Sequence, residues 1–199
     1  MKTFVINGQV REDKGKKAAR TLRAQGLVPG VIYGGNEEIH FAAPILAFRD
    51  LVYSAEFQIA EINIDGKVYK TILKDLQFDV VTDTLTHVDF LELVENKKVI
   101  ANLPLKVVGQ SVGVKAGGRL VVKMNTLKVR TFPKDLVENI EVDITNLQLN
   151  GNIRVEDVKY TAGEVLMPAR QPVASVVMTR ALRQAEQEAA KAAKGGKKK

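Results

Sequence analysis

The 199-residue chain contains no cysteine, so it has no disulfide framework, no zinc–thiolate site and no cysteine nucleophile. This absence fits a reducing compartment. No apolar run approaches the roughly 18 residues that a membrane span requires, and the N-terminal stretch MKTFVINGQV has no long apolar segment. We therefore expect a cytoplasmic protein without a membrane partner.

Histidine is nearly absent, with only His40 and His87 in the chain. In the stretch THVDF, His87 and Asp89 are two residues apart, so on a strand they share one face. Such a pair can orient a general base or supply two metal ligands. No motif supplies a third ligand or a nucleophile, so we expect neither catalysis nor a metal. A structural pair and a polar contact with a ligand remain as alternatives.

A nucleotide-binding phosphate loop is also missing. That loop requires GxxxxGK[ST], so that backbone amides surround the phosphates and the hydroxyl binds magnesium. The stretches GKKAART (15–21) and GVKAGG (113–118) both lack this pattern, and their glycines are typical of turns. We expect no cofactor and no small-molecule substrate.

Positive charge is unevenly distributed along the chain. The formal net charge is +7, yet residues 1–95 carry a small excess of acidic residues. A polyanion site in that half must therefore be a local cluster rather than a general field. One such cluster contains Arg11, Lys14, Lys16, Lys17, Arg20 and Arg23, and no acidic residue occurs between Lys14 and Gly35.

The first half of the chain predicts a mainly β unit with one or two short helices. Residues 2–11 and 30–35 read as strands, and 16–25 as an Ala-rich helix that Gly26 ends. A second short helix is predicted at 46–54. Asp65-Gly66 between two alternating runs indicates a hairpin, and KDLQFDVVTDTLTHVDFLEL (74–93) reads as two more strands.

The second half changes to almost pure β pattern after the polar seam at 95–98. Short apolar runs separated by Gly, Pro and Asn are typical of a sandwich or barrel-like domain. We expect domains at 1–94 and 95–180, followed by a basic tail at 181–199 that is partly helical or disordered.

The predicted helix at 16–25 would present a basic ridge. At about 100° per residue, Lys16, Arg20 and Arg23 lie within about 60° of one another, while alanines and Leu22 can pack on the sheet. A solvated face is the ordinary interpretation of such a ridge. The lack of acidic neighbours and the two arginines favour phosphate or guanine contact instead.

Polar side chains on the last two predicted strands of this half could extend that surface. Asp75, Gln77 and Asp79 alternate with apolar residues, so Gln77 could share a polar face with His87 and Asp89. RNA is read through its shallow minor groove and 2′-hydroxyls, which require such donors and acceptors. Tyr33 could stack or donate a hydrogen bond, although a lone tyrosine is more often part of a core.

Three stretches of the first half, VREDKGKKAARTLRAQGLVPGVIYGG, KDLQFDV and THVDFLEL, resemble the L25 family of bacterial large-subunit ribosomal proteins. PLKVVGQSVGVKAGGRL and NIEVDITNLQLNGNIRVEDV are similar to the second domain of its longer Ctc, or general stress protein, form. The resemblance covers about residues 1–180 and implies a small N-terminal β-barrel that binds 5S rRNA in the minor groove near loop E, at the central protuberance. The RNA-binding residues that it implies are Arg11, Lys14, Gly15, Lys16, Arg20, Arg23, Tyr33, Gln77, His87 and Asp89.

These observations predict a non-enzymatic ribosomal protein whose main partner is 5S rRNA. Asp89 can accept hydrogen bonds from base amino groups or 2′-hydroxyls and can hold His87 in place. The second domain is expected to contact 23S rRNA or neighbouring ribosomal proteins. The alternative is a two-domain, stress-induced β module outside the ribosome that binds proteins or acts as a chaperone.

Overall fold

The computed structural model describes residues 2–35, 37–180 and 182–184. The chain divides into two compact units, and each is described by itself. The first unit comprises residues 1–103, 129–138 and 162–164, and the second comprises 104–128, 139–161 and 165–199. The domain limits expected from the sequence stay predictions. Apart from 182–184, the predicted basic tail lies outside the described residues.

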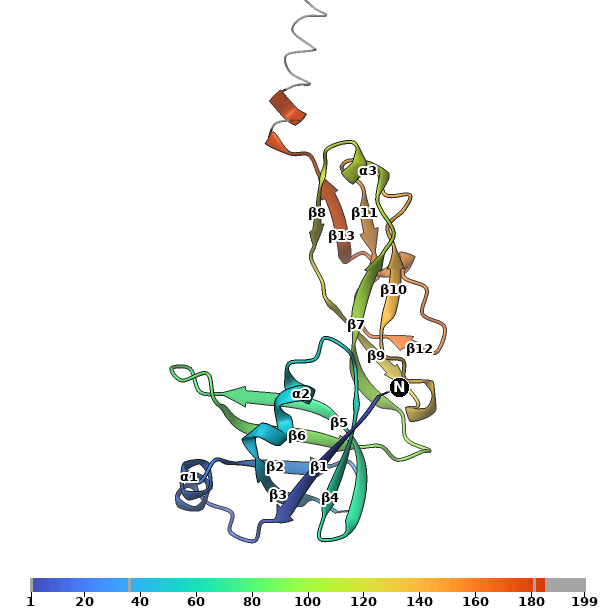
Figure 1. The fold of residues 1–199 in the computed structure, drawn as a ribbon. Helices are drawn as coiled ribbons and strands as arrows, with labels where there is room; N and C mark the ends of the chain where they lie inside the picture. The colour runs from blue at the N-terminus through green and yellow to red at the C-terminus, as the bar shows by residue number, and fades with distance from the viewer. Residues whose placement is uncertain (1, 36, 181, 185–199) are drawn as a thin grey trace, which may run out of the picture. The chain divides into compact units, whose positions relative to one another are not determined.

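The first unit is built on a closed six-stranded barrel with the strand order β1-β3-β2-β6-β5-β4 (Figure 1). Its strands are β1 Thr3–Val10, β2 Leu27–Tyr33, β3 Ile39–Pro44, β4 Ile59–Ile64, β5 Lys67–Phe78 and β6 Leu85–Glu92. Its helices are α1 Lys16–Ala24 and α2 Arg49–Val52, with a 3-10 turn η1 at Ile45–Phe48. The predicted mainly β class, the small barrel and its short helices are confirmed.

Three phenylalanines fill the centre of the barrel. Phe41, Phe48 and Phe90 are fully buried, with ring centroids 6.0 to 6.5 Å apart. Phe41 packs where two strands have glycine, because a Cβ at Gly8 or Gly30 would lie 2.9 or 2.7 Å from its ring. Because side chains alternate along a strand, the residues of β2, β3 and β6 that do not point into this core lie on the outer surface.

The hairpin predicted at Asp65-Gly66 is present, with Ile64 paired to Lys67 and both turn residues at positive φ. The prediction of a separate strand at KDLQF (74–78) is wrong, because these residues continue β5. The pairing of β5 with β6 shifts between Leu73 and Asp75, so Lys74 is an extra, bulged residue. A bulge reverses the alternation of inner and outer residues, and this reversal resembled the start of a new strand.

Beyond the barrel the chain is again mainly β, as predicted. The order β10-β7-β9-β12 forms a four-stranded sheet, and β11-β13-β8 forms a three-stranded sheet. The elements are β7 Val99–Val108, α3 Val112–Lys115, β8 Arg119–Val122, β9 Thr126–Thr131, η2 Pro133–Asp135, β10 Ile140–Asp143, β11 Asn152–Arg154, η3 Val155–Asp157, β12 Gly163–Val165 and β13 Pro172–Val177. Within residues 2–35, 37–180 and 182–184, no helix is long and apolar enough to cross a membrane.

Candidate nucleic-acid interface

Helix α1 forms as predicted, and it lies against strand β2 (Figure 1). Ala18, Ala19 and Leu22 are half-buried, whereas Lys16, Arg20 and Arg23 are exposed, so the basic ridge is open to solvent. The helix ends at Ala24, Gln25 caps it, and Gly26 follows at φ 77°. Every residue of α1 is exposed or half-buried. None of them is buried, so the packing of the helix is light, and its nine residues are fewer than an isolated helix needs to be stable.

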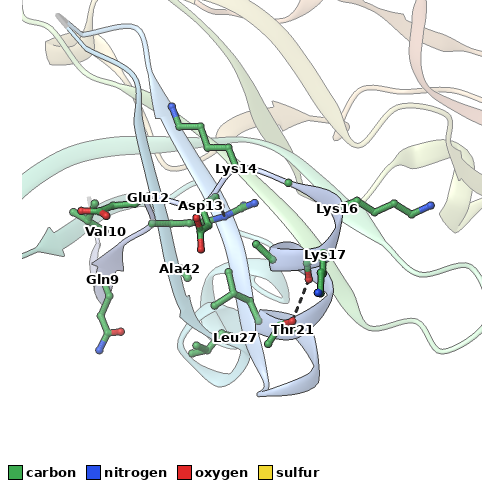
Figure 2. Close-up of a pocket in the computed structure, with 14 residues that line it drawn as sticks. Gln9, Val10, Glu12, Asp13, Lys14, Lys16, Lys17, Thr21, Leu27 and Ala42 are labelled. Atoms are coloured by element: carbon green, nitrogen blue, oxygen red, sulfur yellow. Dashed lines mark hydrogen bonds between the residues drawn. The ribbon is translucent and has the colours of Figure 1, made fainter.

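The start of α1 borders an open cleft of about 930 Å³ (Figure 2). Its lining includes the apolar Val10, Leu27 and Ala42, the acidic Glu12 and Asp13, and the basic Lys14 and Lys16. The first turn of α1 carries no acidic residue, although the helix dipole favours negative charge there. The unpaired amides and the lysines of this turn therefore suit an anionic partner.

A bulge in β6 attaches the end of α1 to the barrel. Gln77 pairs with His87 and Phe78 pairs with Leu85, so Thr86 is the extra residue of β6. The Thr86 carbonyl accepts a hydrogen bond of 3.0 Å from Arg23 Nε. The Thr86 hydroxyl donates to the carbonyl of Gln77 at 2.9 Å. Arg23 is thereby held beside the outer face of β5 and β6, and its other guanidinium nitrogens form no hydrogen bond within residues 2–35, 37–180 and 182–184.

The polar strand face predicted from the sequence is confirmed by the pairing of β5 and β6. Gln77 lies opposite His87, and Asp75 lies opposite Asp89. His87 Nδ1 is 2.8 Å from Asp89 Oδ1, with the two side chains 23% and 29% exposed. Neither atom has a hydrogen bond of acceptable angle within the described chain, so the imidazole and the carboxylate are in close polar contact without a hydrogen bond.

Tyr33 contributes to the same outer face. It is half-buried at the end of β2, whose Val31 pairs with Asp89. Burial raises the pKa of the Tyr33 hydroxyl, and the negative charges of Asp89 and Asp75 add to this effect. The tyrosine therefore remains a neutral hydrogen-bond donor close to the two carboxylates.

Arg11 and Lys14 lie in the loop between β1 and α1. The backbone amide of Arg11 donates a hydrogen bond to the His40 carbonyl at 2.9 Å. The Nε of its side chain donates to the Asp13 carbonyl at 2.7 Å. Lys14 is exposed. Gly15 precedes the helix in extended conformation, and apart from its chain neighbours no atom of the described chain lies within 4 Å of the position that a Cβ would take.

His40 belongs to this surface, although the sequence did not single it out. His40 on β3 pairs with Val31 on β2, and Val31 pairs with Asp89 on β6. The three residues therefore form one row across three strands. Burial lowers the pKa of His40, and the nearby charges of Lys14 and Arg11 lower it further. A signal was available, because His40 alternates with the apolar Ile39 and Phe41.

The lowered pKa of His40 predicts a pH-dependent stability. The unfolded chain binds a proton at His40 more readily than the folded chain does, so the free energy of unfolding should fall as pH falls from about 7 to about 5. Thermal unfolding across this range should show a weaker pH dependence for His40→Gln, which retains His87. An equal dependence in both proteins would contradict the assignment.

The surface therefore combines two kinds of groups. Cationic side chains come from α1 and the loop before it, and hydrogen-bonding side chains come from β2, β3, β5 and β6. In the part of the chain that the structure describes, no three His, Cys, Asp or Glu side chains are grouped as a metal site. Such a combination of charge and polar groups suits a nucleic acid backbone with adjacent base edges or hydroxyls.

Comparison with known proteins identifies the family. Residues 6–90 match the Ribosomal L25p family, and residues 98–180 match the C-terminal domain of ribosomal protein TL5. A protein of Cytophaga hutchinsonii is 41% identical over 191 residues, which cover 96% of this chain and all of the relative. This chain belongs to the L25 family of ribosomal proteins.

Two further relatives agree with this family membership. One from Amoebophilus asiaticus is 40% identical over the full length of both chains, and one from Porphyromonas gingivalis is 39% identical over 92% of this chain and 96% of its own. All three are named large ribosomal subunit protein bL25. The predicted non-enzymatic, cytoplasmic ribosomal protein of the large subunit is therefore confirmed, as is its two-domain L25 form.

Proposed function

We propose that this L25-family protein binds 5S rRNA through helix α1 and the outer face of β2, β5 and β6. The observation that carries the proposal is the placement of Arg23, which the Thr86 carbonyl holds beside the Gln77–His87 pair. The ridge of Lys16, Arg20 and Arg23 would contact phosphates and set the register. The polar strand face would then discriminate among RNA sites.

The minor groove of an RNA helix is the surface that best fits this arrangement. That groove is wide and shallow, and it displays 2′-hydroxyls and base edges that side chains on the outer face of the barrel can reach. Gln77 and His87 offer donors and acceptors, Tyr33 offers a hydroxyl, and Asp89 offers acceptors for 2′-hydroxyls or base amino groups. The loop E region of 5S rRNA is the site that we propose, near the central protuberance.

The second part of the chain is proposed to contact 23S rRNA or neighbouring proteins of the large subunit. Residues 96–180 contain more Lys and Arg than Asp and Glu, which suits either partner.

The full-length chain should therefore bind 5S rRNA much more tightly than an unrelated RNA of the same length. Filter binding of both RNAs at the same salt concentration measures the difference, which is the relevant quantity because non-specific affinity depends strongly on salt. Equal affinity for the two RNAs would remove the support for 5S recognition and leave a general polyanion surface.

Gly15→Ala should weaken binding to 5S rRNA about tenfold or more while leaving the fold unchanged. The backbone at Gly15 is extended, and a Cβ would enter open space, so the free protein tolerates alanine. A phosphate that approaches the amides at the start of α1 would meet the new methyl group. Ala24→Ser, at the exposed far end of α1, is the matched control and should bind as the parent does. Unchanged binding by Gly15→Ala would show that RNA does not approach this turn.

A further inference from the structure

The turn between β5 and β6 carries apolar side chains that the barrel does not use. Val80 is fully exposed, Val81 is 91% exposed, and Phe78 is 38% exposed. Leu46 and Tyr53, on and after the short helices, are 76% and 74% exposed. We refer to these five residues as the apolar tip surface. Isolated exposed apolar residues are ordinary, but a group of large ones marks an interaction site.

These side chains surround a defined groove rather than a flat surface. A groove of about 250 Å³ is lined by Leu46, Val52, Tyr53, Phe78 and Leu85, among others. The side of this groove formed by the β5–β6 turn includes Asp83 and Thr84. An apolar side chain of a partner could enter here while Val80 and Val81 contact the adjoining surface.

The turn is held in one conformation by its own hydrogen bonds. Asp79 Oδ1 accepts from the amides of Val81 and Thr82, both at 2.9 Å, and these bonds lower the pKa of the Asp79 carboxyl. The Asp79 amide donates to the Thr84 carbonyl at 2.9 Å. The turn stands clear of its neighbouring strands in Figure 1. Val80 and Val81 are therefore presented in a preorganised form, which lowers the entropic cost of binding.

The charge of this turn is opposite to that of the basic ridge on α1. Residues 78–85 contain no lysine or arginine, and Asp79 and Asp83 flank the exposed valines. The groove lining itself holds Arg49 and Asp83, and counting the adjoining Asp50 and Asp79 makes the surroundings net acidic. A phosphate backbone would be repelled here, whereas a basic polypeptide would be attracted.

The geometry and charge point to the apolar tip surface as a docking site for a neighbouring ribosomal protein. The partner that fits is a basic segment with one apolar side chain for the groove and lysines or arginines for Asp79 and Asp83. This site begins at the Phe78–Leu85 pair, directly beyond the Gln77–His87 pair of the proposed 5S rRNA face, and its occupant is a protein rather than RNA.

Photocrosslinking from the tip tests the identity of the occupant. The full chain with p-benzoylphenylalanine in place of Val81 is assembled into large subunits, irradiated, and its cross-linked peptides are sequenced. We expect one ribosomal protein, joined within a segment that contains Lys or Arg. The same substitution at Val68, which is 59% exposed on β5, is the control and should not label that segment. Cross-links to rRNA, to a second copy of this chain, or to nothing in fully assembled subunits would overturn the proposal.

A binding measurement separates this site from the 5S rRNA face. Val80→Ser/Val81→Ser should weaken retention on large subunits in a salt wash by about tenfold, because apolar contact is lost. Asp83→Asn should weaken it less and reduce its dependence on salt. Asparagine is tolerated at the Asp83 φ of 54°.

The affinity of both variants for isolated 5S rRNA should equal that of the parent. Val5→Ser/Val68→Ser is the control and should leave both the retention on large subunits and the affinity for 5S rRNA unchanged. Unchanged retention of the tip variants would refute the docking site without affecting the proposed 5S function.

Discussion

Arg20→Ala/Arg23→Ala in the full-length chain should weaken binding to 5S rRNA by about tenfold to a hundredfold. Both arginines lie on the exposed ridge of α1, and Arg23 is already positioned by its bond to the Thr86 carbonyl. Each lost phosphate contact should also flatten the log–log dependence of affinity on salt by about 0.7–0.9. The double variant should therefore show a slope shallower by about 1.4–1.8, measured by filter binding over a salt series.

The matched control removes two positive charges from another part of the barrel. Lys67 and Lys70 are exposed on β5, on the part of the strand that pairs with β4. Lys67→Ala/Lys70→Ala lowers the net charge equally, so it should change affinity and slope much less. If both double variants lose affinity equally, the general charge of the chain binds the RNA and the ridge has no special role.

Phe41→Ala should reduce the free energy of unfolding of the first unit by about 3–5 kcal/mol, enough to abolish a folded barrel in many small proteins. Phe41 is fully buried against Phe48 and Phe90. Its ring also fills the space left by Gly8 and Gly30, so truncation leaves a cavity bordered by two residues without side chains. Urea unfolding followed by far-ultraviolet circular dichroism measures the loss.

Binding should be lost together with this stability, because Phe41 lies next to His40 on β3, and β3 pairs with β2, which carries Tyr33. Val5→Ala, at a site 60% exposed on β1, is the control and should change stability by less than about 0.5 kcal/mol. A Phe41→Ala protein as stable as the Val5→Ala protein would contradict the packing described for the barrel.

Local sequence signals predicted most of the barrel and of its polar face. Gly26 and the Asp65-Gly66 pair mark backbone positions at positive φ, so the end of α1 and the β4–β5 hairpin could be read directly. The alternation of polar and apolar residues placed Gln77, His87 and Asp89 on one surface, and the strand pairing confirms this placement. These features depend on neighbours in the chain, which the sequence displays.

Features that depend on pairing between distant strands could not be predicted in the same way. The bulge at Lys74 exists because β5 must pair with β6 beyond it, and the sequence showed only its effect on the alternation. The extra residue Thr86 gives Arg23 its carbonyl partner across 63 positions of sequence. His40 joins the site only because β3 pairs with β2 and β2 with β6.

Hydrogen exchange of the full-length chain, with and without 5S rRNA, is the most direct test of the proposed interface. Backbone amides of α1 and of the loop that contains Arg11 and Lys14 should become protected, because the helix is short and lightly packed when free. Smaller gains are expected along the outer residues of β5 and β6. Protection limited to residues beyond 104, with α1 exchanging as fast as in the free protein, would contradict recognition of 5S rRNA by the barrel.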